Sequence, residues 1–376
     1  MPYTYSVSPS SGLTWLAESE ARGDEYADLG LPITYQALVV EYTSRCNAKC
    51  GMCYQAAGPK GSDLIGDHAL SLKNICDAID GVTKLPQVGR RFHISGGEAF
   101  LDQAKILAAV DYAHATNHFF DLSVTTNGYW AKTKKRASQV AKDSAMRGLT
   151  MMEISWDVWH GPYISGHTVS NAIEACAEYG LDVHLRILTS KSDSAADALG
   201  KLRTSAIDTV VAIHSAPVMA TGRAVTDVPE SDIFRGANTS AESGWAINGA
   251  CHPSLNLTIN ARGDVFPCCA GVDQTDGLAL WNIKTTPLEH IVKAMNGSKL
   301  YRELVFRGVS SFAPLLLAAG IPLREKYTGI CEFCYDIFSR PEAAKVVLDR
   351  FDNEAKEVIE ALLKSLSSSE TSMVQA

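Results

Sequence analysis

Three cysteines lie close together in the stretch TSRCNAKCGMCYQ, residues 43–55, where Cys46, Cys50 and Cys53 follow a C-x3-C-x2-C spacing. A cubane iron–sulfur cluster takes four ligands, usually cysteine thiolates, so a site with three cysteines leaves one iron open to another molecule. Zinc is the alternative, but it normally takes a fourth Cys or His, and the nearest candidate, His68, lies fifteen residues beyond Cys53. The spacing therefore predicts a metal site with one open coordination position.

A second set of cysteines lies in the last third of the chain. Cys251 precedes the stretch LNLTINARGDVFPCC, Cys268 lies near its end, and Cys331 and Cys334 form a C-x2-C pair. Four thiolates can close a cluster, which suits electron transfer or structural support. A zinc ribbon would use the same four thiolates, so the residues alone leave both metals open.

The elements that must position these residues follow a repeating pattern. Six β-rich runs alternate with helical patterns, and they read YQALVVEYT, RRFHIS, FFDLSVTT, TMMEISWD, LDVHLRILT and DTVVAIHS. One helical pattern, SLKNICDAI, places Leu72, Ile75 and Ile79 on one stripe, and another ends at Gly180. Such alternation predicts an α/β fold with a parallel sheet covered by helices, open or curled into a barrel. Chemistry in these folds occurs at the carboxyl ends of the strands, and the unusual residues of this chain follow strands.

The domain organisation is predicted from shifts in composition. Residues 226–249 are polar and rich in turn formers, which is typical of a linker. LNLTINARGDVFPCC is typical of a hairpin that turns at Arg262-Gly263-Asp264, and a helical stretch follows near 287–306. Residues 341–366 have an apolar face followed by a polar tail. The predicted units are an N-terminal extension (1–35), a barrel (36–225), the linker, a hairpin-plus-helix domain (250–340), and a C-terminal helix with a disordered tail (341–376).

The first cysteine set has a known counterpart. C-x3-C-x2-C after the first strand, followed by Gly96-Gly97-Glu98 after the second, resembles the radical S-adenosylmethionine (SAM) superfamily over residues 36 to about 225. The resemblance implies a partial (β/α)6 TIM-like barrel and a [4Fe-4S] cluster on Cys46, Cys50 and Cys53. In that family the amino and carboxylate groups of SAM chelate the open iron, and the reduced cluster cleaves SAM to methionine and a 5'-deoxyadenosyl radical.

The resemblance also implies SAM contacts at the strand ends. Gly96 and Gly97 would let the backbone approach the ligand closely, and Glu98 would accept hydrogen bonds from the SAM ammonium. The further contacts implied are Asn127 and either Ser155 or Asp157 to the ribose, and Arg186 to the carboxylate. Asn-Gly is also a turn signal, and an arginine in a barrel can pair with any acid. The family often has an aromatic residue before the third cysteine, whereas this chain has Met52 there and Tyr54 after it.

The second cysteine set resembles a twitch-type auxiliary-cluster domain, a shortened relative of the SPASM domain. The resemblance implies one auxiliary [4Fe-4S] cluster, with Cys251, Cys268, Cys331 and Cys334 as its ligands. Cys269, beside a ligand, could be a spare ligand, a core residue or a hydrogen-atom donor to a substrate radical. Cys76 and Cys176 lie on apolar faces of predicted helices, which is typical of core thiols.

Other residues near the strand ends are candidates for substrate contacts. Trp156, Trp159 and His160 follow the fourth strand and could line the substrate pocket, although aromatic residues are also ordinary core packing. Arg223, after the sixth strand, could bind a substrate carboxylate or phosphate.

The expected function is abstraction of hydrogen from an unactivated C–H bond during maturation of a ribosomal peptide, by crosslinking, epimerisation or oxidation. The first alternative is a dehydrogenase or epimerase for an aminoglycoside-type sugar. The second is a zinc-binding scaffold without catalysis. The enzyme hypothesis implies a reducing partner such as flavodoxin or ferredoxin.

Charge and hydropathy exclude two classes of partner. The 376-residue chain has a net charge of -8 and no basic block beyond KTKKR at 132–136, so nucleic acid is not expected to bind. The N-terminus has no signal pattern, and the most apolar segment, residues 313–323, is too short to span a membrane. We therefore expect a cytoplasmic protein with no membrane partner, whose ten cysteines are metal ligands or core thiols rather than disulfides.

Overall fold

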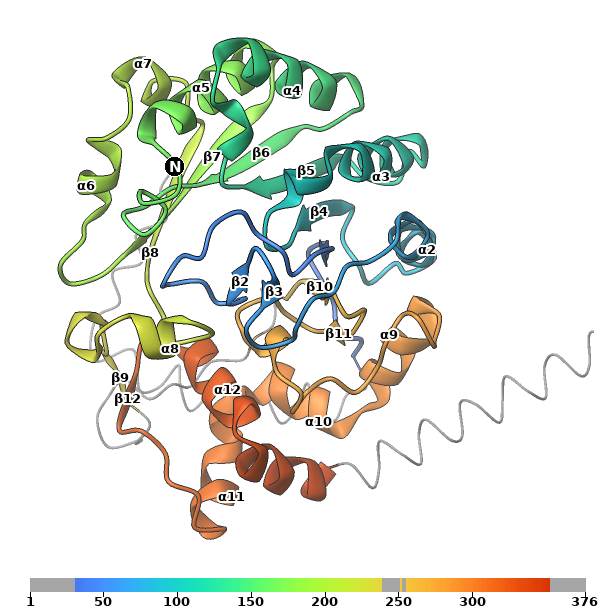
Figure 1. The fold of residues 1–376 in the computed structure, drawn as a ribbon. Helices are drawn as coiled ribbons and strands as arrows, with labels where there is room; N and C mark the ends of the chain where they lie inside the picture. Colours follow the sequence, from blue (N-terminus) through green and yellow to red (C-terminus); the bar gives the residue numbers. More distant parts are fainter. Residues whose placement is uncertain (1–30, 239–250, 252–254, 352–376) are drawn as a thin grey trace, which may run out of the picture.

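The structure, a computed structural model, describes residues 31–238, 251 and 255–351, and it is built around an eight-stranded sheet (Figure 1). Its strand order is β11-β10-β1-β4-β5-β6-β7-β8. All six strands predicted for the barrel are present and pair in parallel: β1 (Leu38–Glu41), β4 (Arg91–Ser95), β5 (Asp121–Thr126), β6 (Met151–Ser155), β7 (Asp182–Thr189) and β8 (Ala212–Pro217).

Helices return the chain between successive strands: α2 (Leu72–Thr83), α3 (Gln103–Ala115), α4 (Lys134–Met146), α5 (Gly166–Glu178), α6 (Ala195–Leu199) and α7 (Thr204–Ile207). The α2 helix begins at Ser71, whose side chain forms a capping box with Asn74. Ile75 and Ile79 are buried in its packed face as predicted, whereas Leu72, in the first turn, is 37% exposed. Gly180 follows the end of α5 with a φ of +73°, the left-handed conformation that glycine adopts without strain.

The two faces of the sheet differ in chemistry because side chains alternate along each strand. Phe92, Val124 and Leu185 belong to the buried face that packs against the helices. His93, Thr125, Glu153, Arg186 and His214 lie on the opposite, polar face, which we call the lumen face. Among the described residues β8 and β11 end the sheet without pairing to each other, so the six βα units form a partial (β/α)6 barrel with a polar lumen.

The predicted hairpin forms from β10 (Leu257–Ile259) and β11 (Val265–Phe266), which pair antiparallel. Gly263 in its turn has a φ of +97°. The sequence did not predict where the hairpin lies: β10 pairs in parallel with β1, with Leu38 opposite Leu257. The hairpin therefore extends the barrel sheet.

Shorter elements complete the described part of the chain. In the first half they are β2 (Ala57–Gly58), β3 (Gly61–Ser62), η1 (Ala99–Asp102), η2 (Tyr129–Ala131), α8 (Ala224–Asp227), η3 (Glu230–Asp232) and β9 (Ala237–Asn238). After the hairpin come η5 (Val272–Gln274), α9 (Leu288–Gly297), α10 (Lys299–Arg302), the π-helix η6 (Glu303–Arg307), η7 (Val309–Phe312), α11 (Ala313–Ala318), β12 (Lys326–Tyr327) and α12 (Ile330–Ser339).

The helical stretch predicted near 287–306 is confirmed by α9, α10 and η6. The C-terminal helix is confirmed over 341–351. Three predicted segments lie outside the described residues: the remainder of that C-terminal unit, the N-terminal residues 1–30, and residues 239–249 of the linker. All ten cysteines are free thiols. Among the residues described, none of the helices combines the length and the apolar character that crossing a lipid bilayer requires.

Candidate active site

The C-x3-C-x2-C loop follows β1 and brings its three thiols together. Cys46 and Cys50 are buried and Cys53 is half-buried, in a small cluster that includes Val218 and Ala220. Burial is the main cause that raises the pKa of Cys46 to about 12, with Glu98 and Cys53 adding to the effect. Crowded, buried thiols lose their protons readily only when a metal cation binds the sulfurs in place of the protons. This set of soft sulfur donors fits an iron–sulfur cluster.

The glycines after β4 are required by the close approach of two backbones. Gly97 donates its N–H to the carbonyl of Thr43 (2.6 Å), and Glu98 donates to that of Arg45 (2.9 Å). A Cβ on Gly97 would lie 2.1 Å from the carbonyl oxygen of Arg45. Gly96 has a φ of +142°, and its Cβ would lie 2.7 Å from the carbonyl of Thr43. Glycine at both positions therefore lets the loop after β4 lie directly against the cysteine loop.

Glu98 is fully buried and ties three elements together. Its Oε1 accepts from the N–H of Phe100 (2.9 Å) and the hydroxyl of Thr126 (2.7 Å), and Oε2 accepts from the N–H of Asn127 (2.8 Å). Burial is the main cause that raises the pKa of this carboxyl. A carboxylate offers about four lone-pair positions, so one remains for a further donor. The proposed contact with the SAM ammonium depends on that position.

Asn127 lies against the cysteine loop. Its Nδ2 donates to Asn47 Oδ1 (3.0 Å) and approaches Cys46 Sγ at 3.7 Å, while its Oδ1 accepts from the N–H of Tyr129 (3.0 Å). The side chain is 5% exposed. Its amide is therefore fixed beside the first thiol, and its contact with a ribose stays a prediction.

The loop after β6 is organised by Asp157. Its Oδ1 accepts from the backbone N–H of Trp159 (3.1 Å) and from both the backbone and the Nδ1 of His160 (3.2 and 2.8 Å). The carboxylate is 2% exposed and lies near Cys50, whose pKa it helps to raise after burial and the other thiols. Ser155, at the end of β6, lies beside Arg186 in the register. The ribose contacts of Ser155 and Asp157 remain predictions.

Trp156 does not line a substrate pocket. Its side chain is 1% exposed and its indole N–H donates to the carbonyl of Ala198 (2.9 Å) in α6. For Trp156 the alternative of ordinary core packing is therefore the correct one, because this residue points to the helix-covered face of the sheet. Trp159 is half-buried and packs on the cysteine loop, near Gly51.

Arg186 already has a carboxylate partner within the protein. Its Nε and Nη2 donate to the two oxygens of Glu153 (3.1 and 2.9 Å), and Thr125 links Glu153 to His93. Burial alone would raise the pKa of Glu153, but the hydrogen bonds and charge of Arg186 outweigh it and hold the pKa at about 2. The Arg186 side chain is 49% exposed, so it can still meet a ligand carboxylate from the lumen.

Arg223 holds the cysteine loop in place. Its guanidinium donates to the carbonyls of Cys50 (2.9 Å) and Ala57 (2.9 Å) and to Asp63 (2.9 Å). Its backbone N–H donates to the carbonyl of Cys53 (3.0 Å). Of the two possibilities that the sequence left open for Arg223, a substrate contact and ordinary packing, the structure favours the second, because its side chain is buried inside the loop that carries the three cysteines. Only its place after the last barrel strand could have indicated this role.

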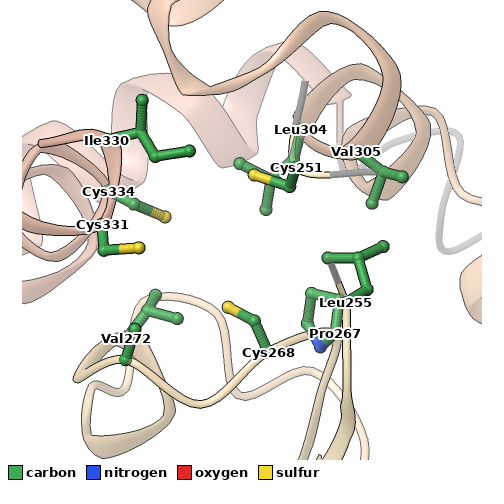
Figure 2. A pocket seen from close by; sticks show the side chains of 11 residues that line it. Cys251, Leu255, Pro267, Cys268, Val272, Leu304, Val305, Ile330, Cys331 and Cys334 are labelled. Atoms are coloured by element: carbon green, nitrogen blue, oxygen red, sulfur yellow. The ribbon is translucent and has the colours of Figure 1, made fainter. Parts of the chain in front are cut away.

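The second cysteine set surrounds a cavity (Figure 2). Cys331 and Cys334 extend from α12, Cys268 follows β11, and Cys251 approaches from the opposite wall. The rest of the lining is apolar: Leu255, Pro267, Ala270, Val272, Leu304, Val305 and Ile330. Burial, followed by the neighbouring thiols, raises the pKa of Cys268. Four soft thiols in an apolar cage fit a closed iron–sulfur site.

Cys269 does not line that cavity, whereas its neighbour Cys268 does. Its thiol meets the side chains of Thr258 and Asn256 and lies close to Asp273 and Glu41. Burial is the main cause that raises its pKa to about 12, and both carboxylates contribute.

The surroundings of Cys269 place it at the lumen. The hydroxyl of Tyr54 donates to Glu41 Oε1 (2.6 Å), and Gln274 Nε2 donates to Glu41 Oε2 (2.7 Å). Tyr54 and Cys269 both lie near Arg186 on β7. The two consecutive cysteines therefore lie in different places: Cys268 lines the auxiliary cavity, and Cys269 lies beside the lumen.

Comparison with known proteins identifies the second site. Residues 251–335 match the family model of the SPASM iron–sulfur cluster-binding domain, a range that includes all four cysteines of the cavity. This match favours iron–sulfur over zinc at that site.

A relative covers most of the chain. The Bacillus subtilis (strain 168) protein named "Putative peptide biosynthesis protein YydG" is 20% identical over 308 residues, which cover 81% of this chain and 92% of that protein.

Similar solved structures include "Native anSMEcpe with bound AdoMet and Cp18Cys peptide", with 12% identity, a TM-score of 0.49, and coverage of 87% of this chain and 100% of that one. Another is "Crystal structure of BtrN in complex with AdoMet and 2-DOIA", with 15% identity, a TM-score of 0.46, and coverage of 74% and 89%.

Proposed function

We propose that the chain is a radical SAM enzyme with a SPASM-type iron–sulfur domain, and that it epimerises a residue of a ribosomally made peptide. The observation that carries the reaction is the position of Cys269, a thiol at the lumen beside the auxiliary site but outside its cavity. The peptide substrate is supported by the name of YydG, which refers to peptide biosynthesis.

The cofactor sites follow from the two sets of thiols. We assign the SAM-binding [4Fe-4S] cluster to Cys46, Cys50 and Cys53, and the auxiliary [4Fe-4S] cluster to Cys251, Cys268, Cys331 and Cys334. SAM is assigned to the strand ends around them, with contacts from Gly96, Gly97, Glu98, Asn127, Ser155, Asp157 and Arg186. When bound, the first cluster and SAM supply a carbon-centred radical that abstracts hydrogen from an unactivated C–H bond.

The protein's own contribution is to return a hydrogen atom from the opposite side. Once a substrate C–H bond has been broken, the Sγ–H bond of Cys269 breaks and a new C–H bond forms with inverted configuration. The sulfur is then one electron and one proton short of a thiol. A reducing partner of the flavodoxin or ferredoxin type supplies the electron, and solvent supplies the proton. Glu41 and Tyr54 hold the surrounding loops so that this thiol stays at the lumen.

The test is deuterium incorporation from D2O under anaerobic, reducing conditions. The substrates are synthetic peptides that correspond to small open reading frames next to the gene. We expect one deuterium in each epimerised residue and loss of the deuterated epimer in Cys269→Ala, with 5'-deoxyadenosine still formed. Cys176→Ala is the matched control, because Cys176 is 0% exposed in the core of α5. An equal yield of deuterated epimer from Cys269→Ala would remove this thiol from the mechanism.

The same experiment separates the sugar hypothesis from the peptide hypothesis. The proposed substrate class is wrong if the enzyme consumes no SAM and incorporates no deuterium with any peptide, but does both with an aminoglycoside-type sugar. We place the enzyme in the cytoplasm, where a reducing environment keeps cysteines as thiols and cluster ligands.

A further inference from the structure

The two edge strands of the sheet, β11 and β8, differ in whether other backbone pairs with them in the described part of the chain. At one edge, Val265 of β11 donates its N–H to the carbonyl of Trp281 (2.9 Å), and Asp264 forms a bridge with Asn282. At the other edge, β8 pairs only with β7 among the described residues. Residues 213–217 of β8 are all exposed, although they belong to the barrel sheet. Within the part of the chain that the structure describes, the edge at β8 is therefore open.

The backbone groups on that open side can be named. Val218 donates its N–H to the carbonyl of Thr189 (2.8 Å), and the Thr189 hydroxyl donates to the carbonyl of Ala216 (3.3 Å). Since the backbone groups of successive residues alternate between the two sides of a strand, those of Ile213 and Ser215 point away from β7. The open side thus offers two N–H donors and their carbonyls to an incoming strand.

Among the described residues, this edge also lacks the usual protection against pairing. Natural edge strands are blocked by charged side chains, bulges, prolines or a covering element. The segment Ala212–Pro217 contains no Lys, Arg, Asp or Glu, and its one proline is the last residue. Ile213 is 43% exposed, and Val211 just before the strand is 61% exposed. An uncharged edge of this length is a template for an extended chain.

The open edge leads directly to the active site. His214 lies beside Arg186 in the register, and its Nε2 is 3.3 Å from Nδ1 of His184, so alternate residues of β8 face the lumen. Beyond the strand, Val218 and Ala220 pack in the cluster that contains Cys46 and Cys50. A strand added beside β8 would therefore place alternate side chains in the lumen, and the residue next to the end of β8 would lie near the three thiols.

We propose that the peptide substrate binds as an added strand on the open edge of β8, hydrogen-bonded to the backbone of Ile213 and Ser215. This inference rests on the proposed function and adds how the substrate is recognised: by its extended backbone, with specificity from alternate side chains in the lumen. A sugar would gain nothing from this edge.

The test compares two substitutions at one position, using the full-length, anaerobically reconstituted enzyme with SAM. The probe is a phage-displayed library of random peptides about ten residues long, the upper range of natural strands. Ser215→Pro removes the N–H on the open side and places its ring there, a change that an edge strand tolerates. Ser215→Ala removes only the hydroxyl. We expect peptides selected on the wild type to bind Ser215→Pro at least about tenfold more weakly, and Ser215→Ala equally well.

A second measurement needs no variant. Hydrogen exchange of the segment 211–218 in the wild type should slow when a selected peptide is added. Iron per chain shows whether Ser215→Pro has folded. Equal binding by Ser215→Pro and Ser215→Ala, unchanged exchange in this segment, or no peptide enriched on the wild type would each overturn the edge proposal. The proposed function fails by a different result, namely that no peptide substrate gains deuterium. That result does not depend on whether a peptide binds to the edge of β8.

Discussion

Glu153 shows how one residue of the lumen depends on its neighbours. Burial would raise the pKa of this carboxyl, and the bidentate contact with Arg186 reverses the effect and holds the pKa at about 2. A depressed pKa gives stability that is fully present above the unfolded value near 4.5 and is lost as the pH falls toward 2. Between pH 5.5 and 8 the wild type therefore gains a constant contribution from this pair.

Arg186→Met should reverse this dependence. Without Arg186, burial dominates and raises the pKa of Glu153 above its usual range, so the carboxyl stabilises the fold only while protonated. The loss of unfolding free energy should therefore grow from pH 5.5 to pH 8, to about 2 kcal/mol, because Arg186 is partly exposed to solvent. Anaerobic urea unfolding at both pH values measures it. Arg91→Met, which breaks the ion pair of Arg91 with Asp121, is the control. A pH-independent difference would contradict the explanation.

At this scale the sequence predicted residue types better than side-chain directions. The three cysteines belong to one buried cluster, and the two glycines lie against the cysteine loop, because both follow from spacing within one loop or one turn. The roles of Trp156 and Arg223 were left open, because their directions depend on Ala198 and on the carbonyls of a distant loop. A pattern of residues close in sequence gives no information about such distant hydrogen-bond partners.

Among the elements, the turn after β4 connects the cysteine loop to the carboxyl ends of the neighbouring strands. It works because the chain at Gly97 has no Cβ, which lets the backbone of Arg45 approach to within contact distance.

Gly97→Ala should separate these two elements. The added methyl group would lie 2.1 Å from the carbonyl of Arg45, so one backbone must move. We expect a loss of about 2–3 kcal/mol in stability and weaker SAM binding, measured by anaerobic equilibrium dialysis. Gly236→Ala is the matched control because nothing lies within 4 Å of the added atom. Equal SAM affinity in both variants would show that the close approach is not needed.

The elements were largely predictable, and their pairing only in part. All six barrel strands and the hairpin have strong local signals in apolar runs and turn residues. The parallel pairing of β10 with β1 was not predicted, since it joins segments far apart in the chain and leaves no mark on either. The domain boundaries at 225 and 250 remain predictions.

For the whole molecule, this pairing makes the auxiliary domain part of the barrel. The β10 strand completes the sheet beside β1, and Leu257 donates its N–H to the carbonyl of Ala37 (2.9 Å). Residues of both regions also share one hydrophobic core.

We therefore expect the two regions to unfold in one step. Cluster absorbance and tryptophan fluorescence should give coincident transitions in an anaerobic urea titration. Cys268→Ser should shift both signals to lower urea together. Two separated transitions, or a shift in the absorbance alone, would show that the auxiliary domain unfolds independently.

The same pairing matters while the protein is being made. β1 emerges early from the ribosome, and one of its edges is completed by β4 soon afterwards, but the other stays unpaired until β10 has been synthesised. For most of translation the nascent chain thus carries a buried-type strand, Leu38–Glu41, with an exposed edge. Prematurely terminated chains that end before residue 257 should aggregate or require a chaperone, since the barrel cannot close its own first strand.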